Sequence, residues 1–122
     1  MKKYGFTTTT LHSDRSKPVE HGAVHKPVHN SAAFCFADAH DLVRVFQGDQ
    51  PGFVYGRQGT PTSAALEEKI TRMEQGILTI GFSSGMAAIS ATLFSLLRAG
   101  DHLVASSFLF GNTTSLFETF AR

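Results

Sequence analysis

The sequence predicts an α/β fold in which a parallel sheet is covered by helices. Segments with helical periodicity alternate with short apolar segments along residues 61–122, and the connections between them are short. Such alternation is typical of parallel strands joined by crossover helices. In addition, a turn of small residues links one apolar segment to the next helix, as at the ligand-binding edge of parallel sheets.

Residues 1–50 are predicted to form an N-terminal arm, because glycines and prolines interrupt any long periodic segment there. Within the arm, residues 37–46 favour a short helix with one apolar face, formed by Leu42, Val45 and Phe46. An arm without its own core needs another surface to cover its aromatic side chains, so we expect association of some kind. These side chains, with one from the next segment, are Phe34, Phe36 and Phe53.

The single cysteine, Cys35, lies between two phenylalanines and has no second cysteine with which to form a disulfide. Cysteine in apolar surroundings behaves as a small hydrophobic residue. We therefore expect a buried, inert thiol.

Residues 51–122 are predicted to begin an α/β domain that this chain leaves incomplete. Thr60-Pro61 is a good helix start, and the helix it opens is expected to end near Gly76 with Leu66, Ile70 and Met73 on its apolar face. The later segments are predicted as a strand over 77–82, a helix over 86–98, a turn at Gly100-Asp101, a strand over 102–106, a loop over 109–112 and a helix over 113–122. The apolar face of the helix over 86–98 is expected to consist of Met86, Ile89, Leu93, Leu96 and Leu97. That of the helix over 113–122 is expected to consist of Leu116, Phe117 and Phe120. Two strands are too few for an independent parallel sheet, which is why we expect an incomplete domain.

The turn from Ser83 to Met86 predicts an anion site. Backbone amides at a helix start have no intrahelical acceptor, and the helix dipole adds partial positive charge there. Upstream, Tyr55-Gly56-Arg57 offers a phenol and a planar guanidinium, which are both good phosphate donors. Together these features predict a phosphorylated cofactor.

The composition is that of a soluble globular protein, with 42% hydrophobic and 17% charged residues and a net charge of +1. It indicates neither a nucleic-acid surface nor a membrane anchor. The first residues are basic, but four threonines, 7–10, follow where a signal peptide needs an apolar core. We therefore expect a cytoplasmic protein.

In combination, the motifs resemble the pyridoxal-phosphate enzymes of cysteine and methionine metabolism. This cystathionine γ-synthase family includes O-acylhomoserine sulfhydrylases and methionine γ-lyase. The resemblance covers about residues 22–122, the N-terminal part of such enzymes, and implies a fragment of the fold-type-I, aspartate aminotransferase-like architecture, with residues 1–50 as an arm reaching a neighbouring subunit. The motifs that carry it are Tyr55-Gly56-Arg57, Pro61-Thr62, Leu66-Glu67, Ser84 to Ile89, Gly100-Asp101-His102 and Phe110 to Thr113.

The resemblance implies pyridoxal 5′-phosphate as the cofactor and a homo-oligomer, commonly a tetramer, with active sites shared between subunits. Gly85 and Met86 match positions that give backbone amides to the phosphate. Tyr55 and Arg57 match the pair that completes the phosphate site of the adjacent subunit. Phe110 falls where a tyrosine stacks on the pyridine ring, so stacking is retained while any role of the hydroxyl is lost.

The implied activity is γ-replacement or γ-elimination on a homoserine ester or a sulfur-containing amino acid. The lysine that forms a Schiff base with the cofactor lies beyond the position matching Arg122, so no catalytic residue is assigned here and the chain alone is expected to be inactive. The lysines that are present are expected to be solvated: Lys2, Lys3, Lys17, Lys26 and Lys69. The Phe110 departure leaves the substrate class open. Two further departures from the family pattern, Thr60 for asparagine and His29 for tyrosine, leave the subfamily open.

Two alternatives stand beside this interpretation. A non-catalytic phosphate-binding or oligomerisation module would use the same helix start. Separately, His21, His25 and His29 have the four-residue spacing of metal ligands on a helix, but Gly22 and Pro27 argue against a helix there and favour three separate loop histidines. No metal site is therefore predicted.

Overall fold

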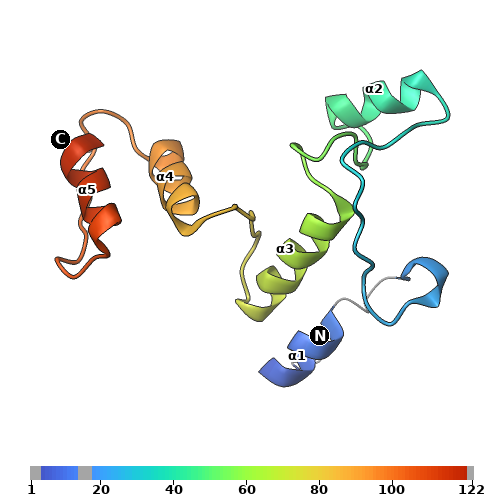
Figure 1. The fold of residues 1–122 in the computed structure, drawn as a ribbon, viewed down its shortest axis with the longest axis horizontal. Coiled ribbons are helices and arrows are strands. Elements are labelled where there is room, and N and C mark those ends of the chain that lie inside the picture. Colours follow the sequence, from blue (N-terminus) through green and yellow to red (C-terminus); the bar gives the residue numbers. More distant parts are fainter. Residues whose placement is uncertain (1–3, 14–17, 121–122) are drawn as a thin grey trace. The chain divides into compact units, whose positions relative to one another are not determined.

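The structure, a computed structural model, describes residues 4–13 and 18–120, except for the side chain of Phe120. It divides into two compact units, residues 1–80 and 81–122. The first unit contains α1 (Phe6–His12), the 3-10 helix η2 (Glu20–Gly22), α2 (Ala39–Gln47) and α3 (Pro61–Met73), and the second contains α4 (Gly85–Leu96) and α5 (Gly111–Phe120) (Figure 1). Whether the arm and the α/β domain divide near residue 50 stays a prediction.

Helix α3 begins where the sequence predicts. The Thr60 side chain accepts a hydrogen bond from the Ser63 amide, and the Ser63 hydroxyl in turn accepts one from the Thr60 amide, which forms a capping box. The helix ends in a Schellman motif, because the Gly76 amide donates to the Thr71 carbonyl at 2.9 Å while Gln75 takes the left-handed conformation. Glycine therefore stands one position after the residue that needs positive φ.

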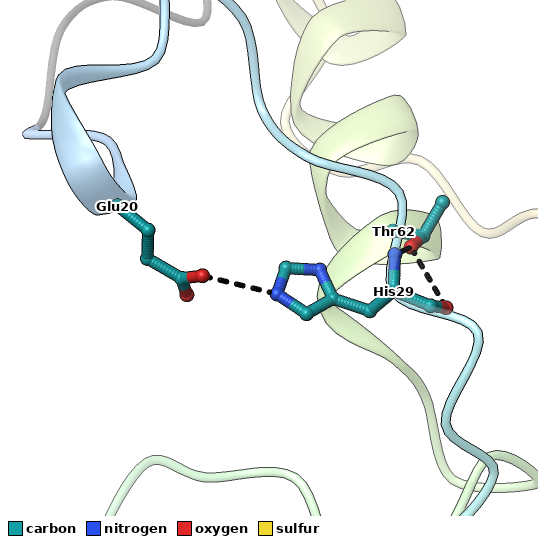
Figure 2. Close-up of polar contacts among 3 residues, drawn as sticks. All are labelled: Glu20, His29 and Thr62. Carbon is teal, nitrogen blue, oxygen red and sulfur yellow. Dashed lines mark hydrogen bonds and ion pairs between the residues drawn. The ribbon is translucent and has the colours of Figure 1, made fainter.

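The arm segment around His29 is held on the first turn of α3 (Figure 2). The His29 amide donates to the Thr62 hydroxyl at 2.8 Å, and this hydroxyl donates back to the His29 carbonyl at 3.4 Å. On the other side, His29 Nε2 lies 3.3 Å from a Glu20 carboxylate oxygen. Residues 20 to 29 are thus tied to α3 by specific polar contacts within this unit. Only His21 of the three spaced histidines lies in a helical element, so no helix aligns them.

A second contact joins the arm to the segment before α3. The Phe34 amide donates to the Val54 carbonyl at 3.0 Å and the Gly56 amide to the Ala32 carbonyl at 2.7 Å, in an antiparallel bridge between Ala33 and Tyr55. The rings of Phe34 and Phe53 lie beside this bridge, 5.9 Å apart between centroids. The arm therefore supports the backbone of residues 54–56, where the first predicted phosphate donors lie.

Two predicted strands are absent. Residues 77–82 and 102–106 form no strand, and the described residues contain no strand elsewhere. A strand needs a neighbouring strand that pairs with its backbone amides and carbonyls. The apolar side chains of these segments are also not covered, since Ile77 is fully exposed and Val104 is 97% exposed. The prediction of a parallel sheet is therefore not confirmed.

Several predictions of burial are also wrong. Cys35 is exposed rather than buried between its phenylalanine neighbours. Among the described residues no apolar side chain is fully buried, and three that were expected to face inward are largely exposed: Phe46, Leu66 and Leu96. The remaining described members of these apolar faces are half-buried. Amphipathic periodicity identifies the apolar face of a helix, but a second surface must cover that face before it becomes a core.

Helix α1 was not predicted, because Thr7 to Thr10 are β-branched residues with low helix propensity. It packs against α3. At its end, the Ser13 carbonyl accepts a hydrogen bond at 2.8 Å from Arg72, which also pairs with Glu68. A tertiary contact thus accompanies a helix that its own sequence disfavours.

Candidate functional site

In the first unit, Tyr55 and Arg57 lie together on an exposed turn. The Gln58 amide donates to the Tyr55 carbonyl at 2.9 Å, which closes the turn, and the Arg57 guanidinium lies over the Tyr55 ring with Cζ 5.9 Å from its centroid. Both side chains are exposed. The phenol and guanidinium are therefore presented to solvent as one group, with the backbone beneath them held by the arm.

Gly56, between them, has a structural role. A Cβ atom at this position would lie 3.5 Å from the Ala32 carbonyl oxygen and from a Thr60 methyl group. These are ordinary van der Waals distances, but they show how closely the turn approaches the arm. The close approach accompanies the short Gly56 to Ala32 hydrogen bond.

In the second unit, α4 begins with a set of free donors. The Ser84 side chain accepts a hydrogen bond from the Ala87 amide at 3.2 Å, and the Ser84 carbonyl accepts one from the Ala88 amide at 3.1 Å. The amides of Gly85 and Met86 precede these and have no acceptor within the helix. The first turn carries no acidic residue, and a Cβ added to Gly85 would meet no atom within 4 Å. The helix start thus has both donors and open space for an anion.

Phe110 directly precedes α5. Its carbonyl accepts the amides of Thr113 at 2.9 Å and Thr114 at 3.1 Å, and its ring is 74% exposed. Thr113 itself is buried, at 6% exposure, and its hydroxyl donates to the Met86 sulfur at 3.7 Å. The predicted stacking residue and the predicted phosphate amides are therefore connected within one unit.

The described residues thus present the five predicted site residues as two groups. Tyr55 and Arg57 share the first unit, and Gly85, Met86 and Phe110 share the second. The sequence interpretation missed Thr113 as a residue that connects the second group. A threonine three positions after Phe110 was visible in the motif, but its burial depends on the packing of α4 against α5.

The two lysines that the structure describes are not in either group. Lys26 and Lys69 are half-buried, not fully solvated as expected, and line a shallow hollow with Leu66 and His25.

A sequence profile described as "Cys/Met metabolism PLP-dependent enzyme" matches residues 7–122. The chain belongs to this family. Its members depend on pyridoxal phosphate, so the expected cofactor is confirmed at the level of the family. The donors at the start of α4 fit that cofactor's phosphate, and the exposed Phe110 ring fits its flat heterocycle.

Curated relatives include a lyase and a sulfhydrylase. The chain is 40% identical over 115 residues to an L-methionine γ-lyase of Fusobacterium nucleatum subsp. polymorphum, and 37% identical over 115 residues to an O-acetyl-L-homoserine sulfhydrylase of Corynebacterium glutamicum. Each alignment covers 94% of this chain, but only 29% and 26% of the respective relative. The chain therefore spans less than a third of the length of these relatives.

Among solved structures, the crystal structure of metB from Corynebacterium glutamicum superposes with a TM-score of 0.82 at 30% identity. The match covers 98% of this chain and 29% of that one. It supports the fold-type-I family, although the sheet expected for that fold is not formed by the described residues. No described helix is both long and apolar enough to span a membrane.

Proposed function

We propose that this chain supplies the phosphate-binding and ring-stacking part of a pyridoxal-phosphate enzyme. The enzyme would carry out γ-replacement or γ-elimination on a homoserine ester or a sulfur-containing amino acid. The observation that carries the proposal is the start of α4, where the free amides of Gly85 and Met86 adjoin open space in a chain of this family. The relatives named for methionine cleavage and for sulfhydrylation agree with both types of reaction.

Each site residue has a role in this proposal. Gly85 and Met86 donate backbone hydrogen bonds to the phosphate, aided by the dipole of α4. Phe110 offers an exposed face on which the pyridine ring stacks. The Phe110 ring has no hydroxyl, so it orients the ring without moving a proton.

Tyr55 and Arg57 complete the phosphate site of a neighbouring subunit in this proposal. Their exposure leaves both free to contact a second chain, and a guanidinium matches the geometry of phosphate oxygens. The active sites of a homo-oligomer would then be shared. We further propose that the protein acts in the cytoplasm.

When bound, pyridoxal phosphate withdraws electrons from the α carbon of an amino acid, which makes chemistry at the γ carbon accessible. The described residues hold and orient this group. The amine that bonds to it is expected from sequence beyond the position matching Arg122, so we propose that these 122 residues alone do not turn over substrate.

The proposal is tested by titrating the purified protein with pyridoxal phosphate, pyridoxal and inorganic phosphate. We expect inorganic phosphate to compete with pyridoxal phosphate, and pyridoxal to bind much more weakly, because the phosphate provides the main anchor. Equal affinity for pyridoxal and pyridoxal phosphate would contradict the phosphate site.

The complete gene product is then assayed with methionine and with O-acetylhomoserine plus sulfide. Phosphate-dependent binding without turnover of either would favour the non-catalytic module.

A further inference from the structure

Thr113 forms hydrogen bonds with two of the proposed site residues. Its amide donates to the Phe110 carbonyl at 2.9 Å, and its hydroxyl donates to the Met86 sulfur at 3.7 Å. It is one of the two buried polar residues among those described, at 6% exposure. A buried hydroxyl needs a partner, and here the partner is a side chain on the first turn of α4.

This arrangement connects the starts of two helices. Met86 is the second residue of α4, and Thr113 is the third residue of α5. The two helices pack against each other, so the bond joins elements that are already in contact. The phosphate amides belong to the α4 start and the stacking ring to the residue before α5. The hydroxyl-to-sulfur contact therefore connects the segment that carries the ring with the segment that carries the amides.

We propose that Thr113 is a positioning residue that sets the separation and orientation of the Phe110 ring and the phosphate-binding amides. This inference rests on the proposed function, because it assumes that these two groups hold the same cofactor. Thr113 need not touch the cofactor itself. Its effect passes through Met86 on one side and Phe110 on the other.

Valine is the decisive substitution, because it keeps the shape of threonine and replaces the hydroxyl with a methyl group, which cannot donate a hydrogen bond. We expect Thr113→Val to raise the dissociation constant of pyridoxal phosphate about 3- to 10-fold, the equivalent of one hydrogen bond. We also expect the circular dichroism of the bound cofactor to change, since that signal reports ring orientation. Thr113→Ser, which retains the hydroxyl, should restore both the affinity and the signal.

Met86→Leu provides a second route, since it removes the sulfur acceptor and leaves the backbone amide in place. If the contact acts as a pair, the double variant should lose little more affinity than either single variant. Thr92→Val is the matched control: the Thr92 hydroxyl is exposed and donates to the Ala88 carbonyl of its own helix. This control should leave both affinity and dichroism unchanged.

The result that overturns the inference is unchanged affinity and unchanged dichroism in both Thr113→Val and Met86→Leu. Additive losses in the double variant would overturn it as well, because two independent contributions would then act. Failure of the proposed function looks different: Arg57→Ala and Gly85→Ala would also leave binding of pyridoxal phosphate unchanged. The two failures are therefore distinguishable in a single set of titrations.

Discussion

The Arg57 guanidinium lies over the Tyr55 ring, with Cζ 5.9 Å from the ring centroid. A cation over an aromatic face keeps its hydrogen-bond donors free at the edge of the guanidinium plane. The exposed turn thus presents a positive charge that can contact an anion.

Arg57→Ala should weaken binding of pyridoxal phosphate by about 1.5–3 kcal/mol, the range for hydrogen bonds to charged groups. The dissociation constant from a spectroscopic titration measures this loss. Arg44→Ala is the control, since Arg44 is exposed and pairs with Asp41 on its own helix. Equal losses in both variants would point to a general charge effect and not to a contact with phosphate.

Gly85→Ala should weaken binding of pyridoxal phosphate without destabilising the fold. A methyl group there meets no atom within 4 Å, so the free energy of unfolding should stay constant or rise by up to about 1 kcal/mol from improved helix propensity. The same methyl occupies the space beside the amides, and affinity for pyridoxal phosphate should fall about 3- to 10-fold. Gly76→Ala, in the loop after α3, should change neither affinity nor its phosphate dependence. Unchanged affinity in Gly85→Ala would remove the α4 start from the site.

Phe110→Ala should lower the affinity by about 0.5–1.5 kcal/mol through lost stacking, with little effect on folding because the ring is largely exposed. Phe110→Tyr retains the ring and should bind pyridoxal phosphate normally.

Mixed oligomers of Phe110→Ala and Arg57→Ala subunits test whether each active site is shared between two subunits. If one subunit supplies Phe110 and its neighbour Arg57, some mixed sites contain both intact residues and recover full affinity. Oligomers that exchange subunits without any recovery would show that each site is built from one chain.

Thr62→Val should loosen the arm by leaving the His29 amide without its hydroxyl acceptor. The contact is partly buried, and an unsatisfied donor costs about 1–3 kcal/mol. Urea unfolding measures the loss, and hydrogen exchange at the His29 amide should accelerate. Thr10→Val removes an exposed hydroxyl bonded within α1 and should do neither. Equal exchange at His29 in the two variants would contradict the arm contact.

The features that were predicted correctly from sequence depend on neighbours within a few residues. Thr60 with Ser63, and Ser84 with Ala87, form caps whose donors and acceptors lie three positions apart. The turn at Gly100 is likewise local: Gly100 has φ +96°, and the Asp101 side chain accepts the Arg98 amide. Such contacts need only residues that are close in sequence, so the sequence alone can predict them.

The features that were wrong or missed depend on distant partners. Residues 77–82 have the composition of a strand, yet a strand exists only where another pairs with it. Cys35 has apolar neighbours in sequence, but its own side chain is exposed. The Thr113 hydroxyl donates to the sulfur of Met86, 27 residues away. This contact depends on the packing of α4 against α5, which the sequence pattern does not specify.

The most direct test of the phosphate site follows the amides of Gly85 and Met86 by NMR, in protein labelled with ¹⁵N at glycine and methionine. Pyridoxal phosphate and inorganic phosphate should both shift these two resonances, whereas pyridoxal should leave them in place. The Gly76 amide, in the loop after α3, should remain unmoved throughout. Saturating pyridoxal phosphate that leaves the Gly85 and Met86 amides unshifted would contradict the account.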